Sequence, residues 1–226
     1  MQTEIEWTLC LPDDQQPVFI RQVAQLFPAA SAPQVHALRS IYYDTPTLEL
    51  AQRHMGLRLR QQGDGWVQTL KFTPTEAMVS ARASDASDAV AANPASLGLH
   101  TRVEIEHATA TQALELHRII HAPMRDFLSS PGIAPRLQPV FETRIERTLW
   151  QLPCNGSLLE LALDAGSIEA NGRSLPVSEI EIELKHGHAD ALFAAVQTLQ
   201  RAFALSPQKQ NKAERGYRLL LGESEP

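Results

Sequence analysis

Four short segments of the sequence alternate charged and aliphatic residues at a period of two. They read Glu4-Ile5-Glu6, Arg58-Leu59-Arg60, Glu104-Ile105-Glu106 and Glu179-Ile180-Glu181-Ile182-Glu183. Because successive side chains of a β-strand point to opposite faces, each segment would place its charges on one face and its aliphatic residues on the other. Three segments are acidic and one is basic, so a sheet that curls on itself could bring both signs into one lumen. Such a lumen would suit a polyanion that is bound through a divalent metal ion.

Other strand-like segments carry charges with the same spacing. Lys71 shares a face with Thr69, and Asp164 shares a face with Glu160, whereas Arg147 lies in a less regular pattern. Each alternation alone is also typical of a surface strand, whose charges pair weakly with those of a neighbouring strand. The clustering of Glu pairs and Arg pairs at a spacing of two over several strands favours a shared charged face.

Eight strands are predicted, and they are the elements that would position these charges. They cover residues 2–9, 35–44, 55–62, 66–73, 100–108, 138–151, 157–170 and 173–185. Tight hairpin turns are indicated by Gly63-Asp64-Gly65, Asn155-Gly156 and Asn171-Gly172. Helical periodicity predicts helices at 15–26, 48–53, 111–130 with a break near Pro123, 188–205 and 212–220. Residues 74–99 are rich in Ala, Ser, Asp and Pro, and are predicted to form a long mobile loop.

The composition of the 226 residues narrows the class of protein. A net charge of −6 gives no general basic field for nucleic acid, and no apolar run approaches the length of a membrane span. The N-terminus enters a strand-like pattern directly, so we expect no signal peptide. Cys10 and Cys154 have no metal-ligand spacing, which favours a reducing cytoplasm and argues against zinc. The eight His residues share no ligand spacing and are interpreted as surface or packing residues.

The order and spacing of the motifs resemble the CYTH superfamily, also called the triphosphate tunnel metalloenzymes, over nearly the whole chain. Glu4-Ile5-Glu6 stands where the family has Glu-x-Glu-x-Lys, and Tyr42-Tyr43-Asp44-Thr45-Pro46 is similar to its Tyr-(Phe/Tyr)-Asp-Thr-Pro segment. The other segments that resemble family motifs are, in chain order, 56–60, 69–71, 102–106, 161–166, 179–184 and 211–217. The last of them is similar to the closing Ser-Lys-x-x-Arg-Gly-Tyr, in a form closest to the bacterial inorganic triphosphatase branch.

This resemblance implies a fold and a reaction. The fold would be α+β, with an eight-stranded antiparallel β tunnel, a closed barrel, flanked by helices, and residues 1–226 would form one CYTH domain. The protein would be a metal-dependent triphosphatase that hydrolyses inorganic triphosphate (tripolyphosphate) to diphosphate and phosphate inside the tunnel. Its cofactor would be Mg²⁺ or Mn²⁺, held by carboxylate oxygens.

The resemblance also assigns roles to residues. The metal ligands would come from Glu4, Glu6, Glu104, Glu106, Asp164, Glu181 and Glu183, with Glu160 as a further candidate. The phosphate-binding residues would be Arg58, Arg60, Lys71, Arg147, Lys212 and Arg215, and the catalytic set would be Glu4, Glu6, Lys71 and Lys212. For Arg215, a structural salt bridge is an equal alternative. Glu179 is interpreted as a solvated residue at the rim, and Tyr42 and Tyr43 as packing residues.

The first motif departs from the family pattern, because Thr8 stands where the family has lysine. A threonine carries no charge for a phosphate oxygen, so the alternative is a module that binds polyphosphate or a nucleotide with weak turnover. Thiamine triphosphate, an RNA 5′ phosphate, or ATP in an adenylate cyclase reaction are further substrates of the fold. The expected partner is a small polyanion, with no nucleic acid and no membrane. The sequence leaves open whether the protein forms a homodimer. It also leaves open whether the chain belongs to a longer protein in which a histidine-rich helical domain, called CHAD, follows the tunnel.

Overall fold

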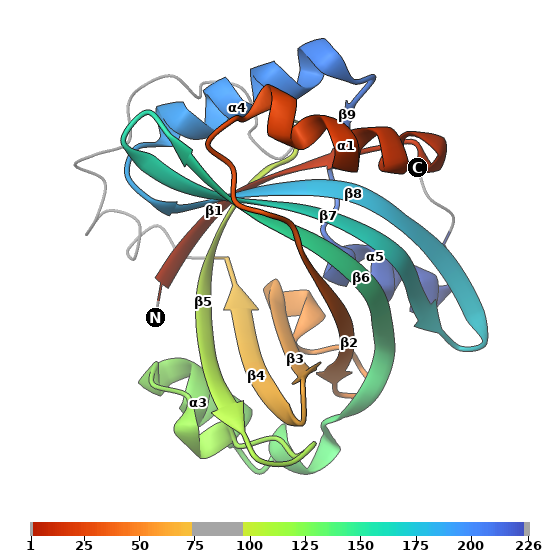
Figure 1. The fold of residues 1–226 in the computed structure, drawn as a ribbon. Helices are drawn as coiled ribbons and strands as arrows, with labels where there is room; N and C mark the ends of the chain where they lie inside the picture. The colour runs from red at the N-terminus through yellow and green to blue at the C-terminus, as the bar shows by residue number, and fades with distance from the viewer. Residues whose placement is uncertain (1, 74–96, 224–226) are drawn as a thin grey trace.

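The computed structural model describes residues 2–73 and 97–223, and their strands form one antiparallel barrel (Figure 1). The strands are hydrogen-bonded in the order β5-β4-β3-β2-β6-β7-β8-β1, and pairing of β5 with β1 closes the barrel. They are β1 (Gln2–Cys10), β2 (Gln34–Asp44), β3 (Met55–Gln62), β4 (Gly65–Phe72), β5 (Leu99–Thr109), β6 (Gln138–Cys154), β7 (Ser157–Ala170) and β8 (Arg173–His186). The eight predicted strands and the closed barrel are confirmed. The structure adds a two-residue strand, β9 (Ser206–Pro207), which pairs with β1.

Two hairpin turns form where the sequence predicts them. Asn155 and Gly156 have φ of 47° and 74°, and Asn171 and Gly172 have φ of 49° and 72°. Positive φ at both central residues is the requirement of the type I′ turn, which matches the right-handed twist of the strands. The two turns join the long strands β6, β7 and β8, and therefore determine which residues of these strands stand opposite each other.

Helices cover the outside of the barrel in two places. α1 (Gln16–Leu26) and α4 (Ala189–Ala202) lie along one side, over an apolar layer that includes Trp7, Leu161 and Ile182 (Figure 1). α3 (Ala122–Leu128) lies on the opposite side, over aliphatic residues of β3, β4 and β5. The odd positions of β1 thus face the helices, and the even positions face the interior, as the alternating pattern predicts.

The last helix, α5 (Lys212–Leu221), packs against the concave face of β6, β7 and β8 and fills one end of the barrel (Figure 1). Its Tyr217 meets Phe141 edge to face at 5.1 Å between ring centroids, and Phe141 stacks on Tyr42 at 4.4 Å. Together with Ile145, Ile168 and Val177 these rings form an apolar cluster between α5 and the strands.

Two predicted helices are corrected by the structure. The segment 111–130 contains only a 3-10 turn, Leu116–Arg118, and the short helix α3. Pro123 stands in the first turn of α3, where its fixed φ favours the helix, so it begins the helix instead of breaking it. The segment 48–53 forms only a 3-10 turn, Ala51–Arg53, which ends at His54 in the left-handed conformation with φ of 53°. Of the predicted loop 74–99, residues 74–96 lie outside the described residues.

The glycine in the middle of α5 allows the helix to approach β6. A Cβ atom added at Gly216 would lie 2.2 Å from Phe141 Cε2, which is too close for any real contact. The Phe141 ring packs against Tyr42 and Tyr217, which restrict its movement away from the added atom. Gly216→Ala should therefore lower the free energy of unfolding by about 1–3 kcal/mol through overpacking, although alanine favours helices. Denaturant titration measures the change. Gly132→Ala is the matched control, since nothing lies within 4 Å of its added Cβ, and an equal loss in both variants would contradict the packing argument.

Candidate functional site

A cavity of about 490 Å³ occupies the interior of the barrel, and charged residues from most of the strands line it. The charged residues on its wall that lie on the barrel strands or begin α5 are Glu4, Glu6, Arg58, Arg60, Lys71, Arg102, Arg147, Glu181, Glu183 and Lys212. The predicted convergence of charges of both signs in one lumen is therefore confirmed. The basic and acidic side chains have different partners, which divides the cavity into two regions.

The basic region is built around Arg60. In the paired registers, Arg60 stands opposite Ser40 of β2, and its Nε donates a hydrogen bond to Ser40 Oγ at 3.0 Å. Within residues 2–73 and 97–223, no carboxylate oxygen lies within 4.0 Å of the Arg60 guanidinium. Burial and the neighbouring Arg58 and Arg147 lower the pKa of Arg60 to about 10. Arg58 lies 3.8 Å from Glu106 Oε1, and Arg147 is paired with Asp164. Of the three guanidinium groups, Arg60 is therefore the one that no described carboxylate neutralises, and a bound anion would stabilise it.

Tyr42 lies beside these arginines on the cavity wall. It is 5% exposed and, in the pairing of β2 with β3, stands opposite Arg58. Burial raises the pKa of its phenol, but Arg58 and Arg60 outweigh this effect and lower the pKa overall. Tyr42 is therefore a packing residue, as predicted, that also presents a polar group to the cavity.

The acidic region is built on Glu4 and Glu6 of β1. Both carboxylates are buried, at 4% exposure each. Lys71 Nζ contacts Glu4 Oε1 and Oε2 at 2.6 and 2.7 Å, and Arg102 Nη2 donates to Glu6 Oε1 and lies 3.6 Å from Glu4 Oε2. Burial raises the pKa of Glu4, but Lys71 and Arg102 hold it down at about 2. For Glu6, burial outweighs Arg102, and with Glu181 and Glu4 it raises the pKa to about 7.

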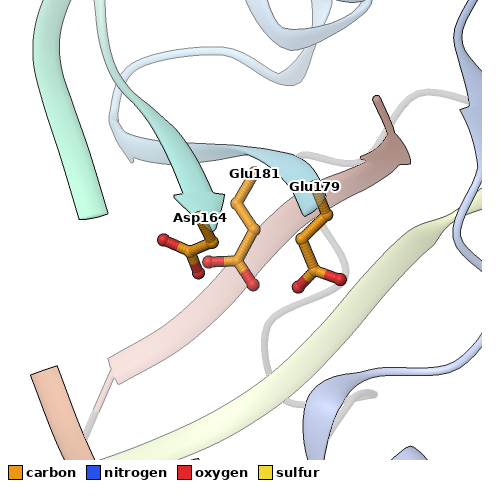
Figure 2. A group of neighbouring side chains, drawn as sticks. All are labelled: Asp164, Glu179 and Glu181. Atoms are coloured by element: carbon orange, nitrogen blue, oxygen red, sulfur yellow. The ribbon is translucent and has the colours of Figure 1, made fainter. Parts of the chain in front are cut away.

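A second group of carboxylates lies deeper in the barrel, beside α5. Asp164 of β7 and Glu179 and Glu181 of β8 lie side by side on neighbouring strands, with one carboxylate oxygen of each within 4.8 Å of the others (Figure 2). Lys212 Nζ contacts all three, at 2.7 Å from Asp164 Oδ2 and 2.8 Å from Glu181 Oε1, with an ion pair to Glu179 as well. Burial raises the pKa of Asp164 and of Glu181, but the cations nearby lower both overall, and these carboxylates raise the pKa of Lys212 against its burial.

Two arginines complete the neutralisation of this deep group. Arg147 makes a bidentate pair with Asp164, with both contacts at 2.6 Å, and also binds Glu181. Arg215 Nη2 donates to Glu179 Oε2 at 2.8 Å. Glu179 is only 1% exposed, so its interpretation as a solvated rim residue is wrong. It anchors α5 to β8, because α5 carries both of its cationic partners.

The chain holds Lys212 in place through the start of α5. Asn211 Oδ1 accepts hydrogen bonds from the backbone N–H groups of Ala213 and Glu214, and Glu214 Oε2 accepts one from the backbone of Asn211. This reciprocal capping box satisfies the free N–H groups of the first helical turn. Lys212 is the first residue of the helix, so the cap fixes the position from which its side chain enters the barrel.

Comparison with protein families and known proteins identifies the family of the chain. The family model described as the CYTH domain matches residues 21–217. The chain belongs to this family. It is 36% identical over 193 residues to the inorganic triphosphatase of Haemophilus influenzae, covering 83% of this chain and 47% of that protein. The chain therefore spans about half the length of the curated relative it matches.

Two solved structures share the fold of this CYTH domain. A putative adenylyl cyclase from Hippeastrum, described as having a dominant triphosphatase activity, superposes with a TM-score of 0.56 at 16% identity, over 99% of this chain and 98% of that chain. A putative adenylate cyclase from Bacillus halodurans superposes with a TM-score of 0.55 at 19% identity, over 95% of this chain and 98% of that chain. At such low identities, these likenesses support the barrel architecture alone.

Some of the predicted site residues do not lie on the cavity wall of this CYTH domain. Glu104 and Glu106 are not among the residues that line the cavity: Glu104 Oε1 lies 3.1 Å from Lys71 Nζ in an ion pair, and Glu106 accepts from Thr69 at 2.7 Å. Asp164 and Arg215 are buried in ion pairs, and Gln151 donates to Glu160 at 3.1 Å. These groups hold neighbouring side chains, whereas Glu4, Glu6, Glu181 and Glu183 face the cavity.

Sequence reasoning left Arg102 out of the site. Its guanidinium lines the cavity and contacts Glu6 and Glu4. The signal was available in the alternation of β5, where Arg102 has the same parity as Glu104 and Glu106 and must share their face. His54, interpreted as a surface or packing residue, is exposed, and it also contributes to the cavity wall.

The carboxylates of the acidic region fit a hard divalent cation. Glu4, Glu6, Glu181 and Glu183 offer oxygen donors only, which suits Mg²⁺ or Mn²⁺ better than softer metals. Burial raises the pKa of Glu183, with Glu4 adding to it and Lys185 opposing it. Burial is the main cause of the raised pKa values of Glu6 and Glu183, and the neighbouring cations do not offset it, so a bound divalent cation would stabilise their charged forms.

Two further findings concern the cysteines and possible membrane-spanning helices. Cys10 and Cys154 are free thiols. Among the described residues, no helix is long and apolar enough to cross a membrane.

The raised pKa of Glu6 predicts how stability depends on pH. A carboxyl whose pKa rises from 4.5 to about 7 on folding contributes stability that is complete below pH 4.5 and is lost as pH rises through 7. At about 1.4 kcal/mol per pH unit, the loss amounts to about 3 kcal/mol. Denaturant titrations of EDTA-treated wild type and Glu6→Gln at pH 5 and pH 8 should therefore diverge, with the wild type losing more stability. Parallel curves would show that Glu6 titrates normally.

Proposed function

We propose that this CYTH domain hydrolyses inorganic triphosphate to diphosphate and phosphate in a reaction that requires Mg²⁺ or Mn²⁺. The observation that carries the proposal is the meeting of two regions in one cavity: three guanidinium groups, of which Arg60 has no carboxylate partner in the described part of the chain, and four facing carboxylates. The activity of the Haemophilus influenzae relative supports it. The single domain over residues 1–226 and a cytoplasmic location, suggested by the two free thiols, remain parts of the proposal.

The arginines would bind and orient the substrate. Arg58, Arg60 and Arg147 present planar forks of N–H donors, which match the oxygen atoms of phosphate groups. Lys71 and Lys212 would add point charges at the two ends of this group, since Lys71 lies beside Glu4 and Lys212 beside Glu181. Because phosphoryl transfer depends mainly on positioning and charge stabilisation, a rigid set of cations in a buried cavity supplies what the reaction needs.

The carboxylates would hold the cation and order the water. Glu4, Glu6 and Glu183 stand on the neighbouring strands β1 and β8, with Glu6 opposite Glu183 in the register, and Glu181 follows towards α5. A bound divalent cation neutralises phosphate oxygens and lowers the pKa of a bound water. The pKa of Glu6 is about 7 before any cation binds. Once its carboxyl group is ionised, Glu6 would be suited to accept a hydrogen bond from that water.

An inorganic substrate is favoured over a nucleotide by the cavity wall. Among the described residues its only Phe, Tyr or Trp side chains are Tyr42 and Tyr217, which are buried beside α5 at 5% and 9% exposure, and its one imidazole is that of the exposed His54. A nucleoside triphosphate would need a surface on which to stack its base at the open end. The segment 74–96, which the structure does not describe, contains no Phe, Trp or Tyr.

Release of phosphate from tripolyphosphate tests the proposal. The assay compares tripolyphosphate, ATP and thiamine triphosphate, with Mg²⁺ or Mn²⁺ and again with EDTA. We expect fast release from tripolyphosphate, abolished by EDTA, and slow release from the other two. Tight binding of tripolyphosphate without release would favour the binding module. Thr8 would then be the first residue to examine, because it is buried opposite Glu181 and does not reach the cavity wall.

A further inference from the structure

Arg102 and Lys71 contact the same oxygen atoms that a cation would use. Arg102 donates to Glu6 and approaches Glu4 at 3.6 Å, and Lys71 Nζ bridges both oxygens of Glu4. The carboxylates are almost fully buried, so these side chains rather than water are their main partners. A divalent cation and a side-chain cation that share one carboxylate oxygen repel each other. A divalent cation therefore cannot bind to Glu4 and Glu6 while the contacts of Arg102 and Lys71 with these carboxylates persist.

We propose that Arg102 and Lys71 compete with the divalent cation for Glu4 and Glu6, and that metal binding releases these two side chains to the polyphosphate. The inference rests on the proposed function, and it adds a coupling between the two ligands of the site. It makes Arg102, which sequence reasoning left out, a positioning residue of the carboxylates before metal binds and a substrate contact afterwards.

The position of both side chains allows such an exchange. Arg102 stands opposite Glu4 in the register of β5 with β1, and Lys71 stands opposite Glu104 in the register of β4 with β5. Both line the same cavity as Arg58 and Arg60. A long side chain that leaves Glu4 or Glu6 can therefore turn towards the basic region by rotating about its own bonds, without movement of the barrel.

The exchange makes the two binding steps reciprocal. The metal binds more tightly when the polyphosphate provides a new partner for Arg102 and Lys71, and the polyphosphate binds more tightly when metal has released them. By contrast, Lys212 and Arg147 hold the deep carboxylates Asp164 and Glu181 through multiple contacts. Asp164 and Glu181 each contact two cations, whereas Arg102 is the one ion-pair partner of Glu6 among the described residues, so we place the exchange at Glu4 and Glu6.

Binding of Mn²⁺ alone to the EDTA-stripped protein tests the proposal without any turnover. Free Mn²⁺ is measured by electron paramagnetic resonance in buffer that contains no phosphate, for wild type, Arg102→Gln and Arg60→Gln. We expect Arg102→Gln to bind Mn²⁺ at least about tenfold more tightly, because a charge-assisted hydrogen bond no longer has to be broken.

Arg60→Gln is the matched control, since it removes the same charge from the same cavity but touches neither Glu4 nor Glu6. Its affinity should change by less than about threefold, as expected for a distant charge in a polar cavity. An equal rise in both variants would show a general field effect, and no rise in Arg102→Gln would show that Arg102 does not compete. Either result would overturn the proposal.

A crystal structure of the wild-type protein soaked in MnCl₂ gives a reading that does not depend on a variant. Mn²⁺ on Glu4 or Glu6 with the Arg102 guanidinium withdrawn from Glu6 would support the exchange, whereas Mn²⁺ there with the Arg102–Glu6 contact intact would overturn it. The phosphate-release assay keeps the two ideas separate. If no phosphate is released from tripolyphosphate, the Mn²⁺ affinity of Arg102→Gln still tests the exchange. If Arg102→Gln does not bind Mn²⁺ more tightly, the proposed hydrolysis is unaffected.

Discussion

Replacement of Lys212 by methionine should lower the free energy of unfolding by about 3–5 kcal/mol, the usual effect of removing one partner from a buried ion pair. Lys212 is 8% exposed, and its Nζ is in contact with Asp164, Glu179 and Glu181. Methionine fills similar space but leaves two buried carboxylates, Asp164 and Glu179, and the partly buried Glu181 with only Arg147 and Arg215 to neutralise them. Denaturant titration at pH 7 measures the loss.

The pH dependence identifies the cause of this loss. The neighbouring cations depress the pKa values of Asp164 and Glu181, so the stability they contribute is present at neutral pH and is lost as pH falls through those values. The deficit of Lys212→Met should therefore shrink between pH 7 and pH 3. Lys209→Met, at an exposed position three residues earlier, should change stability by less than about 0.5 kcal/mol. A deficit that does not depend on pH would indicate lost packing instead of lost charge.

Replacement of Glu6 by glutamine should lower the rate of metal-dependent phosphate release by at least about 100-fold, comparable to removing one preorganised polar group from an active site. Glutamine keeps the size of the side chain and one oxygen, but removes the charge that a divalent cation needs. Glu6 is buried on the cavity wall opposite Glu183, so no described carboxylate can take its place without a shift of the strands. Steady-state phosphate release at saturating Mg²⁺ or Mn²⁺ measures the effect.

Glu146→Gln is the control for this prediction. Glu146 lies on β6, on its exposed outer face, and carries the same charge far from the cavity wall. Its variant should retain the wild-type rate within about twofold, since surface changes of this kind seldom disturb a distant site. An unchanged rate in Glu6→Gln would refute the role of Glu6, and an equal loss in both variants would refute its specificity.

The sequence predicts the strands and two of their turns well because the signal for them is local. Alternation such as Arg58-Leu59-Arg60 requires only that the segment be a strand for the two arginines to share a face. The Asn-Gly pairs at 155–156 and 171–172 require positive φ, which the structure has at all four residues. Segment 111–130 has no comparable constraint, and its apolar residues fit a helix, a 3-10 turn and a loop that packs on β3–β5 equally well.

Roles within the charged face depend on partners from distant segments. Glu179, Glu181 and Glu183 have the same parity and nearly the same sequence surroundings, but α5 brings Lys212 and Arg215 to Glu179 and leaves Glu183 towards the cavity. No pattern along β8 could indicate this difference, because it depends on where a helix more than thirty residues away packs.

By itself, the alternation in the sequence determined that charges of both signs gather on one face of several strands, since side-chain direction in a strand follows from parity alone. Closure of these strands into a barrel was predicted from the resemblance to the CYTH family. Only the tertiary structure decided which carboxylates are already neutralised and which are not. The pKa of a buried carboxyl depends on the cations within a few ångströms, and these come from other strands and from α5. For this reason the structure separates Glu6, with a pKa of about 7, from Glu4, with a pKa of about 2, although they stand two residues apart on one strand.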